Sequence, residues 1–336
     1  REGYPDVFFL QPRVFRRTEG LRFEGKSHNY IVGSSEKYPR KFPINELIFV
    51  HARTDENAQK RAEQRRKMNL KNLGEDIKNE PDKPRPYFYL AQTYLEIKDY
   101  KKAEKYYKIY LGKSEWGDER AQAYLGLSTM LAGEDDDARK EEAKKYALLA
   151  ITERWDRAEP YLLLGDIAFE VGKDKDLSDF DRIEAFYEAE HWYKAATKMK
   201  PPISSLFLHG PSYAFLPYER LCQVYDRTCR WQDAIENGLV VLKFLKTLDS
   251  MSRNIQVWEK NLQVIPENRS ILVFARGAEF IAPIAEYFTK HNYNVALHER
   301  FDSDLLTFCH KPGDIVFFEW CDVNVVEATR SREKPA

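Results

Sequence analysis

Hydrophobic and polar positions divide the chain into three regions with different periods. Up to about residue 53, short runs of β-branched and aromatic residues are separated by Pro, Gly and Ser, a pattern typical of strands and turns. From about residue 54 onward, apolar residues recur every three or four positions, as they do in amphipathic helices. Near the C-terminus the period changes again. The strands predicted in the first region are Val7–Leu10, Arg13–Arg16, Leu21–Glu24 and Glu46–Val50.

The helical region contains an internal repeat. In each copy, a Leu followed by a small residue lies on the first helix, and a small residue lies where the second helix crosses it. Small residues at such positions let two helices approach closely, and a ring one turn later fills the groove beside them. The first-helix markers are Leu90-Ala91, Leu125-Gly126, Leu164-Gly165 and Leu221-Cys222, and the second-helix markers are Ala103, Ala143, Ala189 and Ala234.

One copy spans about 34 residues, and this period resembles that of tetratricopeptide repeats. The predicted fold class is mainly α: a tetratricopeptide (TPR) helical solenoid with a short β-rich segment before it and an α/β unit after it. Three inserts interrupt the copies, at residues 133–139, 172–181 and 200–213, and the last is Pro-rich and apolar. Inserts of this length are surface elaborations or places where a partner is gripped.

The C-terminal region alternates strands with helices. The order is typical of a βαβ unit that begins a parallel sheet, Rossmann-like but incomplete. The predicted strands are Ile271–Phe274, Tyr293–Leu297 and Ile315–Phe318, and the predicted helices lie at Phe280–Phe288 and Phe301–Phe308.

Composition narrows the classes of function. The 53 Lys and Arg residues nearly balance the 54 Asp and Glu residues, which argues against a nucleic-acid partner, and no apolar run is long enough to cross a bilayer. None of the four cysteines has the spacing of a zinc site. They are predicted to be buried free thiols in a reducing compartment, and the chain to be cytoplasmic.

Within the first 50 residues, Pro12–Arg17, Gly20–Gly25 and Ser27-His28-Asn29 resemble the closing segment of a family-2 GT-A glycosyltransferase domain. The resemblance implies that His28 helps to hold a divalent cation, Mn²⁺ or Mg²⁺, against the diphosphate of a nucleotide sugar. Asn29 stands where that family has Glu, and the family's paired aspartates and general base are absent from this segment. The alternative is that His28 is a polar turn residue.

The C-terminal region resembles the start of a family-4-type GT-B glycosyltransferase domain. The resemblance rests on the turn Gly277–Phe280 and on the segment Asp314–Asp322. It implies that Glu319, Trp320 and Asp322 line an acceptor cleft. Alternatively, Trp320 packs under the next helix and Asp322 caps that helix.

Together these resemblances predict part of a multi-domain glycosyltransferase that uses a nucleotide-sugar donor and a glycan or protein acceptor. Its expected domains are residues 1–53, 54–264 and 265–336, and the chain is expected to be inactive alone as a piece of a longer protein. The alternative is a non-catalytic TPR scaffold for protein–protein interaction. In the glycosyltransferase, the concave face of the repeats would hold an acceptor protein, a glycan or a second subunit through first-helix residues where they are exposed: Tyr87, Gln92, Tyr161 and Tyr218.

Overall fold

A computed structural model describes residues 7–9, 22–24, 30–32, 58–134, 136–204, 206–246, 248–263, 269–274, 286, 288–290, 293–298 and 315–318. The chain divides into two compact units, Arg1–Ile255 and Gln256–Ala336. Helices dominate the described part of the first unit, and the described strands of the second unit form a parallel sheet.

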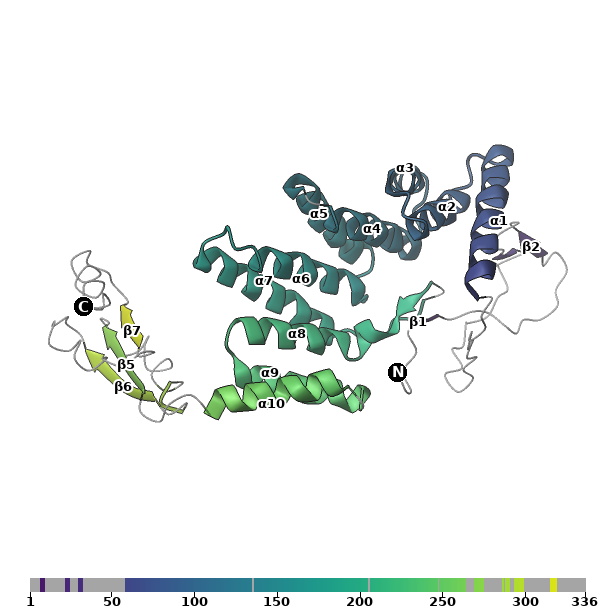
Figure 1. Ribbon diagram of the computed structural model, residues 1–336. Helices are drawn as coiled ribbons and strands as arrows, with labels where there is room; N and C mark the ends of the chain where they lie inside the picture. The colour runs from purple at the N-terminus through teal and green to yellow at the C-terminus, as the bar shows by residue number, and fades with distance from the viewer. Residues whose placement is uncertain are drawn as a thin grey trace. The chain divides into compact units, whose positions relative to one another are not determined.

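The helices of the first unit form antiparallel hairpins that stack one after another (Figure 1). A leading helix, α1, packs on α2, and the hairpins are α2–α3, α4–α5, α6–α7 and α8–α9, followed by α10. Their bounds are α1 Ala58–Asn79, α2 Arg85–Glu96, α3 Tyr100–Leu111, α4 Gly117–Ala132, α5 Asp137–Glu153, α6 Glu159–Gly172, α7 Asp179–Thr197, α8 Leu216–Arg227, α9 Trp231–Phe244 and α10 Asp249–Gln263.

A glycine meets a tyrosine ring at two helix crossings, one within the hairpin α6–α7 and one where α4 meets α3 of the preceding hairpin. A Cβ atom added to Gly165 of α6 would lie 2.4 Å from the ring of Tyr193 on α7, and one added to Gly126 of α4 would lie 2.7 Å from the ring of Tyr107 on α3. Only glycine leaves room for the ring at these two crossings. The predicted spacing of small and large residues is therefore confirmed, and the fold is a TPR-type helical solenoid.

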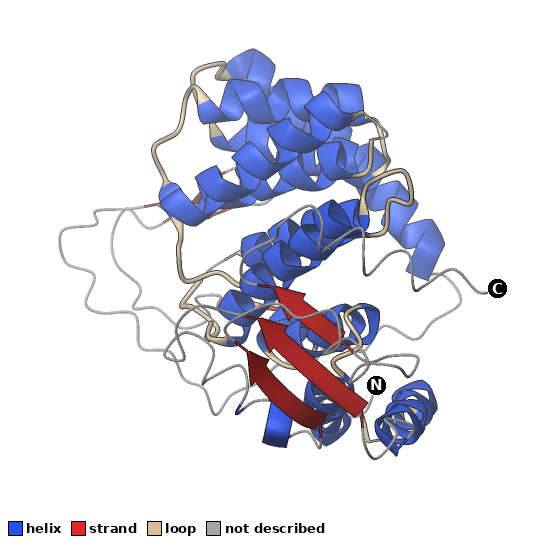
Figure 2. Ribbon diagram, turned by 90° about the vertical axis from the view of Figure 1, so that its left-hand side faces the viewer, coloured by secondary structure: helices blue, strands red, loops and turns tan. Residues whose placement is uncertain are grey.

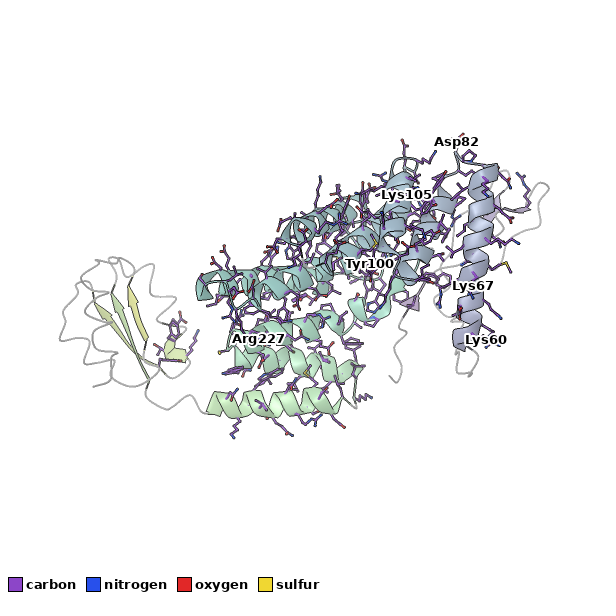
Figure 3. All side chains as sticks on the ribbon, turned by 45° about the horizontal axis from the view of Figure 1, so that its top comes forward. Lys60, Lys67, Asp82, Tyr100, Lys105 and Arg227 are labelled. Carbon is purple, nitrogen blue, oxygen red and sulfur yellow. The ribbon has the colours of Figure 1, made fainter. Side chains whose placement is uncertain are left out.

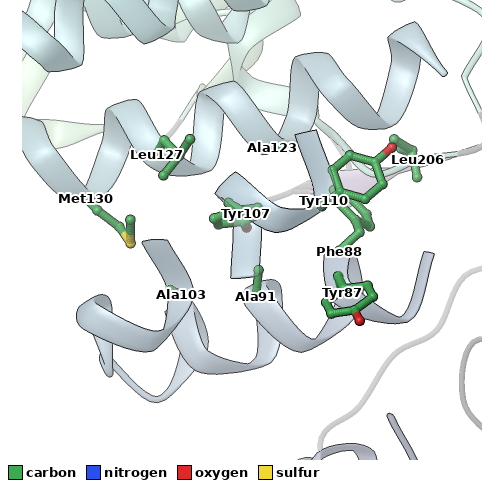
Figure 4. Close-up of a cluster of buried hydrophobic side chains, with 10 residues drawn as sticks. All are labelled: Tyr87, Phe88, Ala91, Ala103, Tyr107, Tyr110, Ala123, Leu127, Met130 and Leu206. Carbon is green, nitrogen blue, oxygen red and sulfur yellow. The ribbon is translucent and has the colours of Figure 1, made fainter. Parts of the chain in front are cut away.

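The core near the start of the solenoid is rich in aromatic side chains (Figure 4). Phe88 and Tyr110 are buried with ring centroids 5.2 Å apart, and Leu127 packs in the same cluster. Leu206 also belongs to this cluster, although it lies in the segment between α7 and α8. A residue far along the sequence thus completes the first hairpins.

That segment, residues 200–213, is called the connector below. It includes a short strand, β4 (Leu208–His209), and a 3₁₀ turn at Gly210–Tyr213. Strand β1 (Val7–Phe8) pairs with β4 in antiparallel register, so the N-terminal segment meets the connector (Figure 1). Strands β2 (Arg22–Glu24) and β3 (Tyr30–Val32) pair with each other.

The strand predictions in the N-terminal segment are confirmed in part. The predicted Val7–Leu10 and Leu21–Glu24 overlap β1 and β2, whereas β3 was not predicted. The predicted Arg13–Arg16 and Glu46–Val50 lie outside the described residues.

The described residues of the second unit form three parallel strands in the order β6–β5–β7. They are β5 (Arg269–Phe274), β6 (Tyr293–His298) and β7 (Ile315–Phe318), drawn as the three large red arrows in Figure 2. The predicted parallel sheet is confirmed with nearly the predicted bounds. The predicted helix Phe301–Phe308 lies outside the described residues.

Helix α1 is charged and largely exposed to solvent. Lys60 and Lys67 project from it in Figure 3 and are exposed, while Leu73 is buried against the solenoid. No helix among the described residues is long and apolar enough to cross a membrane.

The prediction for the cysteines is correct at one of the two described positions. Cys222 is buried, and burial raises the pKa of its thiol to about 12. Cys229 is exposed because it lies in the turn between α8 and α9 at a φ of 56°, and the prediction of burial was wrong there. Cys309 and Cys321 lie outside the described residues.

Candidate functional site

The connector is anchored to the solenoid by buried polar and apolar side chains. The Ser204 hydroxyl donates to Oδ2 of Asp118 at 3.0 Å, and Asp118 also binds the guanidinium of Arg154. Leu206 and Leu208 are buried on either side of the exposed Phe207. The connector is therefore an extended segment bound along the starts of α4 and α6.

Two charged side chains at the start of α6 bind the backbone of the connector. The Arg157 Nη2 donates to the carbonyl of Phe207 at 3.1 Å, and Oε1 of Glu159 accepts from the backbone N–H of His209 at 3.0 Å. A carbonyl and the N–H two residues later lie on the same edge of a strand. Arg157 and Glu159 therefore satisfy one edge of β4 as a neighbouring strand would.

The second oxygen of Glu159 fixes the end of the connector. The Tyr213 hydroxyl donates to Oε2 of Glu159 at 2.7 Å and accepts from the backbone N–H of Ala158 at 3.3 Å. Burial and the adjacent Glu159 carboxylate raise the pKa of Tyr213 above its usual range, so its proton stays in place at neutral pH. One carboxylate thus holds both the strand and the 3₁₀ turn that follows it.

The hydrogen bonding of Arg157 is incomplete. Its side chain is only 1% exposed, and its Nε and Nη1 have no hydrogen-bond partner among the described residues. Buried donors without partners lower stability. The contact of Arg157 with the Phe207 carbonyl is therefore made at a cost to the fold.

Several large apolar side chains around the connector are exposed. Trp155, just before α6, is 71% exposed, and Ile203 and Phe207 of the connector are 67% and 60% exposed. Exposed apolar groups on segments that adjoin one another mark interaction sites more often than isolated ones do. We call this set the apolar edge; its members are Val7, Phe9, Trp116, Trp155, Ile203 and Phe207.

The segments that carry the apolar edge contact one another. The rings of Phe9 and Phe207 meet edge to face at 4.7 Å. The segments of Trp116 and Trp155 are also neighbours. A Cβ atom added to Gly117, which follows Trp116, would lie 3.5 Å from the carboxylate of Glu153, two residues before Trp155. The members of the apolar edge thus lie on segments that contact one another through the connector.

A second buried carboxylate lies beside the same line. Glu119 of α4 is 2% exposed, its Oε1 lies 3.0 Å from Nε of Arg85, and its Oε2 accepts from the Tyr110 hydroxyl at 3.1 Å. Burial raises the pKa of Glu119 to about 7, despite the attraction of Arg85. Tyr110 lies beside Leu206 of the connector in Figure 4.

The residues predicted from the glycosyltransferase resemblance lie outside the described part of the structure. These are His28, Glu319, Trp320 and Asp322, whose predicted roles are not tested. In sequence, His28 falls between β2 and β3, and Glu319 directly follows the last residue of β7. Within the described residues, no three His, Cys, Asp or Glu side chains are grouped as metal ligands would be.

The four residues predicted for the concave face lie on first helices of the hairpins, as expected, but in different environments. Tyr87 is only 7% exposed, and its hydroxyl donates to the Pro81 carbonyl at 3.0 Å. Gln92 and Tyr218 are half-buried, and the Tyr161 hydroxyl donates to the Trp155 carbonyl at 3.0 Å. Their binding role stays a prediction.

Sequence reasoning missed Arg157, Glu159 and Leu206. The available signal was the connector itself, because an apolar, Pro-rich insert in a charged solenoid needs a surface to cover its leucines. The pairing of Arg157 with Phe207 and of Glu159 with His209 spans 50 residues, so no local pattern indicated it.

Comparisons with known proteins show limited similarity. No family model matches the chain, and no curated protein matches it. Among solved structures, a crystal structure of MamA is 17% identical to this chain, with a TM-score of 0.39. The matched region covers 57% of this chain and 95% of the MamA chain. TTC0263, a thermophilic TPR protein of Thermus thermophilus, is 16% identical to this chain, with a TM-score of 0.37. The matched region covers 62% of this chain and 96% of the TTC0263 chain.

The buried Glu119 carboxylate predicts a pH-dependent stability. Its pKa is raised in the folded state, so between about pH 4.5 and 7 the folded chain keeps a proton that the unfolded chain has lost. The contribution of this group to stability therefore decreases as pH rises through that range. We expect the Glu119 carboxyl to lower the free energy of unfolding of the wild-type chain by about 1–3 kcal/mol across this pH range. In Glu119→Gln this loss should be absent.

The measurement is urea unfolding of both chains at several values between about pH 5 and 8. Glu153→Gln is the matched control, because Glu153 binds Arg120 at 2.7 Å at a half-buried site. The control should retain the wild-type slope of stability against pH. An unchanged slope in Glu119→Gln would contradict the assignment.

Proposed function

We propose that the chain is a protein-interaction scaffold and that its partner binds at the apolar edge. Two features of the solenoid that occur on the same segments support this proposal. An extended segment is already bound there by Asp118, Arg157 and Glu159, and large apolar side chains beside it remain in water. Covering such side chains with a partner protein is favourable because it removes their apolar surface from water.

The side chains of the apolar edge suit a protein partner. Trp and Phe are enriched at the centres of protein interfaces, where their rings fill pockets with little loss of side-chain entropy. The chain has almost equal numbers of basic and acidic residues, which gives a nucleic acid no net attraction. A partner with an apolar surface is therefore the occupant that we propose.

The scaffold is tested by chemical cross-linking and purification from the source cells, followed by reconstitution with the purified partner. We expect Trp155→Ser together with Phe207→Ser to weaken direct binding at least about tenfold, because two exposed anchors are lost. Leu148→Ser is the matched control, since Leu148 is exposed on α5 but is not part of the apolar edge. Equal binding by all three chains would contradict the proposal.

We propose as a second candidate that the chain belongs to a larger glycosyltransferase, with domains at residues 1–53, 54–264 and 265–336. The sheet order β6–β5–β7 supports it, because β5, the first of the three strands in sequence, lies between the other two. The chain therefore changes direction across the sheet at β5, and open α/β sheets bind ligands at such a switch point. Phe274 and Phe318 are register partners at that edge. Glu319, Trp320 and Asp322, which follow in sequence, would then line the acceptor cleft.

In this second candidate, His28 would bind Mn²⁺ or Mg²⁺ together with the nucleotide sugar, and the apolar edge would hold a protein or glycan acceptor. A cytoplasmic location remains part of the proposal. We expect a nucleotide sugar with Mn²⁺ to raise the melting temperature of the chain and His28→Ala to abolish that rise. Equal melting temperatures with and without the ligands would count against this candidate and leave the scaffold untouched.

A further inference from the structure

Strand β4 is held from one side only by the solenoid. The Phe207 carbonyl and the His209 N–H both face the start of α6, where Arg157 and Glu159 bind them. Successive residues of a strand direct their backbone groups to opposite edges. The backbone groups of Leu208 therefore face the other edge, where Phe8 is the register partner of Leu208.

The connector keeps its place independently of the strand on that other edge. Leu206 and Leu208 are buried, and Ser204 is bound to the buried Asp118. Tyr213 closes the far end of the connector through Glu159. The edge of β4 is therefore prepared for an incoming strand before that strand arrives.

The resident on this edge is short. Strand β1 pairs through two residues, Val7 with His209 and Phe8 with Leu208. Val7 and Phe9 are exposed, so Phe8 is the described residue of this segment that turns inward, and its ring meets Tyr213 edge to face at 6.1 Å. Two-stranded ladders of this length are marginal in water, so an external strand can compete with β1.

We propose that the outer edge of β4 is a strand-addition site for an extended segment of a partner protein, and that Val7–Phe8 occupies it in the absence of that partner. The inference rests on the proposed scaffold function and specifies how the partner is bound. Main-chain hydrogen bonds to Leu208 would supply affinity, as in other cases of β-augmentation. The side chains of the bound strand that face the solenoid, at every second position, would determine which partner segments bind.

The resident strand defines the chemistry of the partner segment. Its inward residue is aromatic, as Phe8 is, and packs against Tyr213. Its next residue is also apolar, as Phe9 is, and covers the exposed ring of Phe207. The partner segment is therefore extended, with an aromatic residue followed by a second apolar one.

The test uses a fluorescent peptide with the sequence of residues 4–11 and the full chain in two forms. Phe8→Pro removes the backbone N–H of the resident strand and empties the edge of β4. Because the resident no longer competes, we expect this chain to bind the peptide at least about tenfold more tightly than the wild-type chain does. A peptide that itself carries Phe8→Pro is the control and should not bind.

A second variant of the chain tests the same site if Phe8→Pro disturbs folding. Val7 and His209 are directly opposed, a spacing that a disulfide can bridge, so Val7→Cys with His209→Cys allows the resident strand to be locked or released by oxidation or reduction. The reduced chain should bind the peptide, and the oxidised chain should lose at least about nine-tenths of that binding.

Equal binding by the oxidised and reduced chains, or none by either the reduced or the Phe8→Pro chain, would overturn the strand-addition site. These outcomes are separate from the test of the scaffold. A partner that is lost on Trp155→Ser with Phe207→Ser would support the scaffold even if the peptide failed to bind. Peptide binding without any such partner would show that the edge of β4 accepts a strand but would contradict the scaffold and the assignment of that strand to a partner protein.

Discussion

A backbone that leaves the helices and runs along the protein surface must find partners for its N–H and carbonyl groups. In the connector, Glu159 meets this need by accepting from the His209 N–H and the Tyr213 hydroxyl, and Arg157 adds a bond to the Phe207 carbonyl. The rest of this side of the molecule depends on that arrangement. Leu206 can fill the core of the first hairpins, and β1 can pair with β4, only while the connector is extended.

Repetition made the solenoid predictable. At two of the crossings the constraint is local, because Gly126 and Gly165 each face a tyrosine ring, and the spacing that meets it is visible in sequence. The parallel strands were predictable for a similar reason. Their apolar runs, such as Ile315–Phe318, are short and continuous, as strands buried on both faces are. In both cases, a pattern within one element carried the information.

The candidate site was not predictable in this way, because its contacts join distant segments. Ser204 and Asp118 are 86 residues apart, and nothing near either residue indicates their hydrogen bond. The aromatic residues assigned to the concave face illustrate the same limit. Spacing placed Tyr87 on a first helix correctly, yet its exposure depends on the cluster around Phe88 and Leu206, which forms only in three dimensions.

The start of α6 holds the connector as a strand and, through it, the N-terminal strand. Hydrogen–deuterium exchange of the full chain with Glu159→Ala measures whether this is so, with Glu153→Ala as the control on α5. We predict faster exchange in the connector and also at Val7–Phe8, with the control like the wild type. Unchanged protection at Val7–Phe8, with the connector exposed, would contradict it.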